Sequence, residues 1–395
     1  MTNQSLNTPQ AGPIQAWIIV AISLLPMMAV VVLMPIIPAI FGNFKDIPNI
    51  LTLAPLVVSA PGLCIALFSP YAGYLTDRLG RRNLLLIFTF LYGFGGVFPF
   101  FFNSFPVLMG GRLLLGIGEA FILTIGNTLL GDYFSESKRA KWLMWQGIVG
   151  SACGTMLLSL SGYLSTMGWQ YPLLVYCFAI IISVGVYFFI FEPARKTEVE
   201  VEASTAIVSG GKFPTLIVVR IALTTLVAGI LYFVYTLHFS MALDSMGIKD
   251  RQAIGNYSAI ASIAVPIGAL LFKLISNRSG AFQFACMFFL IGAGLIGIGL
   301  AKGINLTVAA AWVQQLGCGM LISTLIAWGL KQLAPEFRGR GMGFWTSGFF
   351  MGQFLSPLAV SGMRNITGSL LNAFVVFGII CVLIAAVNFY LSKKS

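Results

Sequence analysis

The sequence predicts an all-α membrane protein whose twelve transmembrane helices form two pseudo-symmetric six-helix bundles. Three observations support this fold class: an apolar composition, a series of long apolar runs and an internal repeat. Of the 395 residues, 58% are hydrophobic and 9% are charged, and the mean hydropathy is +0.93. Such a chain cannot give itself a normally solvated surface, so most of it is expected to lie in lipid.

The apolar runs are long and do not alternate in polarity. A helix needs roughly 20 apolar residues to cross the hydrocarbon layer, whereas a strand of a membrane barrel alternates in polarity over about ten. The runs predict helices at 16–42, 51–75, 83–102, 106–131, 141–166, 172–191, 214–243, 253–275, 282–302, 306–332, 341–364 and 370–392. The first run is too long for the apolar part of a signal peptide, so it is expected to remain as a helix.

The basic residues predict which side of the membrane the loops occupy. With both termini in the cytoplasm, seventeen Lys and Arg lie on the inside and five on the outside. Cytoplasmic loops of membrane proteins carry an excess of Lys and Arg. We therefore expect an integral protein of the plasma membrane or bacterial inner membrane with cytoplasmic termini. The same bias accounts for the formal charge of +11 without a nucleic-acid partner.

A polar stretch at 192–213 has no apolar face and predicts a flexible cytoplasmic linker. It separates a predicted N-terminal bundle, 1–191, from a predicted C-terminal bundle, 214–395. An offset of 200 residues aligns Asp77–Gly80 with Asn277–Gly280, at equivalent points of the two halves. Two equivalent bundles that flank a central path are the architecture that such a repeat implies.

The loop between the second and third predicted helices carries the most specific motif. It contains Gly73, Leu75, Asp77, Arg78, Gly80, Arg81 and Arg82. Four charges within six positions, between two apolar runs, indicate a turn at the membrane surface. Gly73 can allow close helix approach, and Asp77 can accept hydrogen bonds from a helix N-terminus.

This motif resembles the pattern G-x-L-x-D-R-x-G-R-R of the major facilitator superfamily, and the resemblance covers nearly the whole chain. It implies the fold of that family, with twelve helices in two bundles that rock about a central cavity. It also implies that Asp77 contacts the start of the eleventh helix, near Gly341, and so latches the halves together in one conformation. The alternative is a basic loop that only sets the topology.

The fourth predicted helix carries two charges inside an apolar segment. Arg112 and Glu119, with Gly116 and Gly118 between them, resemble the R-x-x-x-G motif of the same family. A charge at the bilayer centre costs roughly 2.5 to 3.5 kcal/mol, so it normally faces a cavity or a partner. Arg112 and Glu119 share a helix face about 10 Å apart, and Asn127 extends this polar stripe, which we expect to face the central path.

More than one role is open for each of these charges. Glu119 binds a proton during transport, is the structural partner of a cation or amide on a neighbouring helix, or contacts the substrate directly. For Arg112 the resemblance implies proton coupling or contact with an anion. The alternative is a fixed cation that is held by backbone carbonyls of adjacent helices.

The fifth helix departs from the family's antiporter pattern, G-x-x-x-G-P-x-x-G-G. Leu157 and Leu158 stand where Gly-Pro would fall, so this part of the resemblance gives no support to antiport.

Polar and aromatic side chains of several helices are candidates for a substrate cavity. They are Gln146, Tyr232, Tyr235, Gln314, Gln315, Trp345 and Gln353, together with Asn127. The alternative for each of them is that it only forms a hydrogen bond to a buried polar neighbour. His238, the single histidine, is expected near the outer end of the seventh helix as an interfacial residue.

Enzyme chemistry has no support in this sequence. The six cysteines lie singly in predicted helices, and no G-x-x-x-x-G-K-S/T loop occurs. We therefore expect no enzyme activity, no metal site, no cofactor and no ATP hydrolysis, so that transport follows a gradient.

The favoured function is proton-coupled export of a small amphiphilic organic compound by a monomer in membrane lipid. One alternative is an uptake symporter or facilitator of a small organic solute or anion, which Arg112 and the fifth helix support. The other is a lysolipid transporter, because Gly118, Glu119 and Ala120 resemble the same helix of spinster-type transporters.

Overall fold

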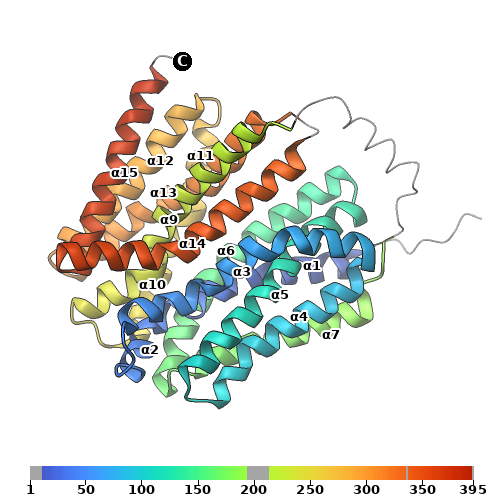
Figure 1. Ribbon diagram of the computed structural model, residues 1–395, viewed down its shortest axis with the longest axis horizontal. Helices are drawn as coiled ribbons and strands as arrows, with labels where there is room; N and C mark the ends of the chain where they lie inside the picture. Colours follow the sequence, from blue (N-terminus) through green and yellow to red (C-terminus); the bar gives the residue numbers. More distant parts are fainter. Residues whose placement is uncertain (1–10, 194–212, 335–336, 394–395) are drawn as a thin grey trace, which may run out of the picture.

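The computed structural model describes residues 11–193, 213–334 and 337–393, and these residues form helices and connecting loops without a strand. The first half contains α1 Pro13–Val31, η1 Met34–Ile36, α2 Ile37–Asn43, α3 Ile50–Leu79, α4 Arg81–Val97, η2 Phe98–Phe101, α5 Phe105–Tyr133, α6 Glu136–Met167, η3 Tyr171–Tyr176 and α7 Cys177–Phe189 (Figure 1). The second half contains α9 Thr215–Ser245, α10 Arg251–Ser262, α11 Ala264–Ile275, α12 Gly280–Leu300, α13 Ile304–Gln332, α14 Arg338–Thr367 and α15 Leu370–Ser392.

The predicted all-helical membrane fold is confirmed, and the predicted helices agree with the observed ones to within a few residues. In the described part of the chain, eleven helices are long and apolar enough to cross a membrane. The helix α14 is of similar length but less apolar, since it carries Arg338, Arg340 and Arg364. With α14 included, the described residues form the twelve predicted membrane segments.

Two of the predicted helices are interrupted, which the sequence analysis did not anticipate. The first segment is not continuous over 16–42, because a short 3-10 turn that contains Pro35 separates α1 from α2. The eighth segment divides at Ile263 into α10 and α11, three residues before Pro266. Proline has no N–H to donate and its ring clashes with the preceding turn, so both breaks follow from local chemistry.

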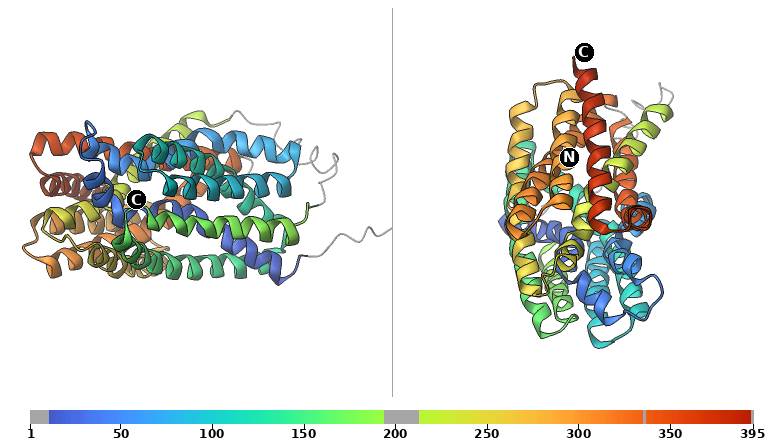
Figure 2. Two further views of the ribbon diagram at one scale, coloured as in Figure 1. Left: turned by 90° about the horizontal axis from the view of Figure 1, so that it is seen from below. Right: turned by 90° about the vertical axis from the view of Figure 1, so that its left-hand side faces the viewer.

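The helices pack as two groups that correspond to the two halves of the sequence. In the first group α5 packs against α3 and α4, while α1 packs against α5 and α6. In the second group α9 packs against α14, and α12 packs against α13 and α15 (Figures 1 and 2). We propose that the linker between the two bundles begins at residue 192 and ends at residue 213.

The two groups meet along two pairs of helices, α3 with α14 and α6 with α10. At the second pair the guanidinium of Arg251 donates to the carbonyl of Ser165 at 2.7 Å. The glycines Gly162 and Gly255 lie back to back there, because a Cβ built on Gly255 would be 2.9 Å from the Cα of Gly162. These contacts close the side of the molecule opposite the C-terminal end of α7 and the N-terminal end of α9.

Candidate functional site

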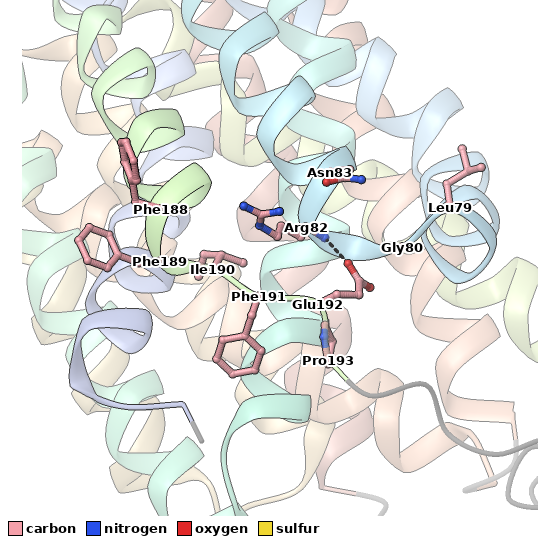
Figure 3. Close-up of a pocket in the computed structure, with 10 residues that line it drawn as sticks. All are labelled: Leu79, Gly80, Arg82, Asn83, Phe188, Phe189, Ile190, Phe191, Glu192 and Pro193. Atoms are coloured by element: carbon pink, nitrogen blue, oxygen red, sulfur yellow. Dashed lines mark hydrogen bonds between the residues drawn. The ribbon is translucent and has the colours of Figure 1, made fainter. Parts of the chain in front are cut away.

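The motif loop turns sharply at Gly80, between α3 and α4. Gly80 has φ +89°, a backbone conformation that glycine adopts without strain. The carboxylate of Glu192 accepts hydrogen bonds from the backbone N–H of Arg81, at 2.8 and 2.9 Å. It also accepts one from the backbone N–H of Arg82 at 2.8 Å, which Figure 3 shows. This carboxylate therefore caps the N-terminus of α4 and complements its dipole.

The side chains of the loop bind to neighbouring helices of the first group. Arg81 forms an ion pair with Asp132 near the end of α5. The guanidinium of Arg82 donates to the carbonyl of Tyr187 on α7 at 2.6 Å and lies 5.8 Å from the centre of its ring. The guanidinium of Arg78 lies 4.5 Å from the ring of Tyr74. The loop is thus held in place by α5, by α7 and by Glu192, three residues beyond the end of α7.

Two expectations for this motif have different outcomes. Close helix approach at Gly73 is wrong in this structure, because a Cβ built there would meet nothing within 4 Å. Asp77 belongs to α3, but its side chain lies outside the described residues, so the latch stays a prediction. The partner helix α14 does begin close to the predicted position, at Arg338.

Arg112 is buried inside the first group, with a relative exposure of 1%. Its guanidinium donates to the carbonyls of Val57, at 3.1 Å, and of Ala29. It also donates to the hydroxyl of Tyr176 at 2.9 Å and lies 5.6 Å from the centre of that ring. The expected direction toward the central path is therefore wrong for Arg112, because carbonyls of α1 and α3 hold its guanidinium inside the bundle.

Glu119 lies seven residues after Arg112, on the same face of α5, and is 2% exposed. Its Oε2 atom has no hydrogen-bond partner in the described part of the chain. Arg112 on the same helix acts on it electrostatically, and Glu119 in turn acts on Cys64 of α3 and Tyr92 of α4. An unpaired carboxylate in such surroundings is the kind of group that functional sites hold.

Two glycines bring neighbouring helices close to Glu119. A Cβ built on Gly116 would lie 2.6 Å from the Cα of Pro61 on α3, and one built on Gly118 would lie 2.8 Å from the carbonyl of Phe88 on α4. Any larger residue would push these helices away. The glycines predicted as part of a motif therefore seal the environment of Glu119 on two sides.

The candidate cavity residues fall into different places. The side chain of Asn127 lies outside the described residues, and Gln146 is half-buried on α6. Gln314 packs against Gly294 of α12 and donates to the sulfur of Cys318 at 3.1 Å, so it points between α13 and α12. The Oε1 atom of Gln314 is buried without a hydrogen-bond partner among the described residues. Gln315, on the same helix, is buried beside Tyr235.

The residues Trp345, Phe349 and Gln353 form one face of α14. The ring of Trp345 stacks on that of Phe349, with centroids 5.5 Å apart and an interplanar angle of 10°. The ring of Phe349 also lies 5.7 Å from the ring of Tyr232 on α9, measured between centroids. Both the indole Nε1 of Trp345 and the Oε1 of Gln353 are buried without a hydrogen-bond partner among the described residues.

Helical geometry assigns this face of α14 to the interior of the molecule. At 100° per residue, the face lies between the side that packs on α9, marked by Gly352, and the side that packs on α3, marked by Phe350. Phe344 and Leu358, which are strongly exposed, lie on the opposite side. Trp345 and Gln353 are therefore placed where the two groups face each other, as expected for cavity residues, and Phe349, which the sequence analysis did not single out, lies between them.

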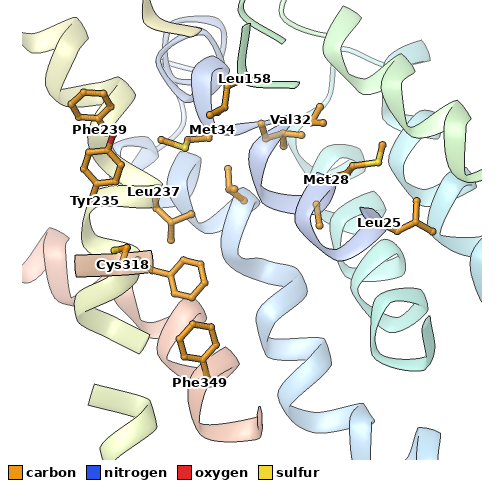
Figure 4. Close-up of a cluster of buried hydrophobic side chains, with 14 of the residues drawn as sticks. Leu25, Met28, Val32, Met34, Leu158, Tyr235, Leu237, Phe239, Cys318 and Phe349 are labelled. Carbon is orange, nitrogen blue, oxygen red and sulfur yellow. The ribbon is translucent and has the colours of Figure 1, made fainter. Parts of the chain in front are cut away.

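An apolar cluster lies between the two groups beyond this face. It includes Met34 of η1 and Leu158 of α6 from one group and Leu237 and Phe239 of α9 from the other (Figure 4). His238 lies seven residues before the end of α9, near the predicted end of the helix, but its side chain is buried within the protein. The ring is 3% exposed, and its Nδ1 lies 3.1 Å from the carbonyl of Val234.

Comparison with known proteins gives a consistent result. The family model of the Major Facilitator Superfamily matches residues 16–304. The tetracycline resistance protein of class B from Escherichia coli is 26% identical over 183 residues, which are 46% of this chain and 45% of that protein. The putative metabolite transport protein YyaJ from Bacillus subtilis is 24% identical over 371 residues, which are 81% of this chain and 76% of the relative. The chain thus spans about half the length of the tetracycline resistance protein that it matches.

Solved structures share the fold at low sequence identity. The D-xylose-proton symporter superposes with a TM-score of 0.78 at 13% identity, covering 95% of this chain and 96% of the symporter. The nucleoside transporter NupG superposes with a TM-score of 0.77 at 11% identity, covering 95% of this chain and 99% of NupG.

Proposed function

Since the chain belongs to the Major Facilitator Superfamily of membrane transporters, we propose that it couples proton movement to the export of a small amphiphilic organic compound by alternating access. The family is one of transporters and not of enzymes, so the chain is an integral membrane transporter. The coupling ion, the direction and the substrate class are the proposal. A monomer with cytoplasmic termini is part of the same proposal.

The observation that carries proton coupling is the environment of Glu119. An ionised carboxylate that is buried without hydrogen bonds costs several kcal/mol even after relaxation. We infer that Glu119 carries a proton in the conformation described above, and that a rocking movement which admits water to α5 releases it. Arg112 supports this cycle because its fixed positive charge offsets part of the cost of the ionised form.

Export of an amphiphile is supported by the face of α14 that carries Trp345, Phe349 and Gln353, and by the relatives of this chain. The aromatic face of Trp345 and Phe349 offers apolar contact, and their neighbour Gln353 offers a hydrogen-bonding group. Two relatives of this chain are named tetracycline resistance proteins. The motif loop from Gly73 to Arg82 is intact as well.

Two other substrate classes have specific support. Uptake of a small solute is supported by the departure at Leu157 and Leu158 and by the fold shared with a D-xylose-proton symporter. Lysolipid transport is supported by the run from Gly118 to Ala120. A protein named spinster from Drosophila melanogaster is 28% identical over 231 residues, 53% of this chain and 38% of that protein.

A reconstituted assay with one probe for each class tests the proposal. Purified protein in liposomes receives an imposed pH gradient of either sign, and tetracycline, D-xylose and a lysophosphatidylcholine are followed separately. We expect tetracycline to accumulate on the side with the higher proton concentration, with D-xylose and the lysolipid unchanged.

A pair of carboxylate-to-amide variants supplies the control. Glu119→Gln is expected to remove the response to the pH gradient. Asp244→Asn changes an acid that forms a surface ion pair with Lys249 at 2.9 Å, and it is expected to retain the response. The proposal would be contradicted if none of the probes were transported under either gradient. It would also be contradicted if transport by Glu119→Gln responded to the pH gradient as the wild-type protein does.

A further inference from the structure

A groove of about 520 Å³ lies between α9, α12, α13 and α15, apart from the region where the two groups face each other. Its walls include Val227 of α9, Phe284 of α12, Trp328 of α13 and Asn388 of α15. The rings of Phe284 and Trp328 meet edge to face, with centroids 5.6 Å apart, and give the groove a rigid wall.

The groove opens toward the lipid. Leu223 and Val227 at its edge are 58% and 45% exposed, and Leu383 and Val387 of α15 are exposed in the same region. Large apolar side chains exposed on a membrane-spanning bundle face the acyl chains of the bilayer. A ligand in this groove therefore enters from the membrane.

The polarity of the groove changes along α9. Arg220, Thr224 and Val227 lie at spacings of four and three residues, so they share one face of the helix. At ~1.5 Å per residue, this face leads from a cation to an apolar wall over about 10 Å. Asn388 of α15 adds a second polar side chain to the same lining, and its Nδ2 donates to the carbonyl of Ile384 at 2.9 Å.

Arg220 is positioned at the mouth of the groove. Its side chain is exposed, donates to the amide oxygen of Gln332 and lies 6.0 Å from the centre of the Trp328 ring. It belongs to the end of α9 that follows residues 194–212, at the end of the helix where a phosphate of one leaflet would lie. A guanidinium with donors to spare binds phosphate through charge-assisted hydrogen bonds.

We propose that this groove binds one glycerophospholipid of the leaflet on the linker side. The phosphate is held by Arg220, the ester carbonyls lie at Thr224 and Asn388, and an acyl chain packs against Val227, Phe284 and Trp328. The order of cation, polar groups and apolar wall matches the order of phosphate, glycerol ester and chain in such a lipid. A free phosphate or soluble anion would leave the apolar part of the groove unfilled. This binding site does not depend on which substrate the protein transports.

Quenching of tryptophan fluorescence by brominated lipid tests the proposal. The protein is reconstituted in phosphatidylcholine with increasing mole fractions of phosphatidylglycerol that carries brominated chains. The signal of Trp328 is the difference between the wild-type protein and Trp328→Phe. We expect this signal to be quenched at a lower mole fraction of brominated lipid than the remaining tryptophan fluorescence.

Two further variants test the headgroup and the groove. Arg220→Gln is expected to raise the mole fraction for half quenching about fivefold, because one basic residue at an anionic surface is worth about 1 kcal/mol. The matched control Lys273→Gln, at the corresponding end of α11, is expected to leave it unchanged. Ala281→Phe, which fills the groove, is expected to abolish the preferential quenching. The proposal would be overturned if Trp328 were quenched no more readily than the other tryptophans. It would also be overturned if Arg220→Gln and Lys273→Gln had the same mole fraction for half quenching.

Discussion

Substitution of Gly255 by alanine is predicted to prevent the tight closure of the two groups at α6 and α10. A Cβ at this position would lie 2.6 Å from the carbonyl oxygen of Leu158 and 2.9 Å from the Cα of Gly162, and both are backbone atoms of the other group. Overpacking of this kind costs typically 1–3 kcal/mol. The clash exists only while this side is closed, so about 2 kcal/mol shifts the equilibrium toward its opening by a factor of about 30.

A distance measurement between spin labels reads out this shift directly. Labels at Asp46, before α3, and at Ile366, near the end of α14, are both exposed on the side that closes. We expect the distribution in Gly255→Ala to gain a population at longer distance. The control is Gly150→Ala on α6, where a Cβ would meet nothing within 4 Å and the gain in helix propensity is the same. An unchanged distribution in Gly255→Ala, or the same change in both variants, would refute the reasoning.

Three further variants test other parts of the structure. Glu192→Ala removes the carboxylate that caps α4 and is expected to lower the free energy of unfolding by about 1–2 kcal/mol, measured by thermal unfolding in detergent; an unchanged melting temperature would contradict this assignment. Tyr176→Phe leaves a buried guanidinium one partner short and is expected to cost about 1–3 kcal/mol, whereas Tyr163→Phe at an exposed site should be neutral. Asp77→Asn is expected to weaken the predicted latch and to increase thiol labelling at the ends of the helices beside the linker; equal labelling in wild type and variant would count against the latch.

The fold could be predicted from the sequence because lipid imposes a simple rule. Each span needs about 20 apolar residues and internal hydrogen bonds, so length and composition locate the helices. The breaks at Pro35 and Ile263 were missed, although a proline inside each run was a visible signal. Whether a helix is interrupted depends on local backbone geometry. A hydropathy average over many residues does not detect such a break.

The site was predicted in part, since the helical repeat places residues on a face but does not identify what that face touches. Arg112 and Glu119 do share a side of α5, yet Arg112 turns to the carbonyls of α1 and α3. Glu192 was assigned to the linker because its neighbours in sequence are polar. Its contact with the loop at Gly80 joins residues that are more than a hundred positions apart, and no spacing rule reveals it.

The central claim is that the protonation of Glu119 couples the proton gradient to transport. The most direct measurement compares two modes of tetracycline transport in the same liposomes: exchange at equal pH on both sides, and net transport driven by a pH gradient. Glu119→Gln is predicted to retain exchange, because a neutral side chain in place of the acid still permits the rocking movement, and to lose the driven mode. Driven transport that persists in Glu119→Gln at the wild-type rate would contradict the claim.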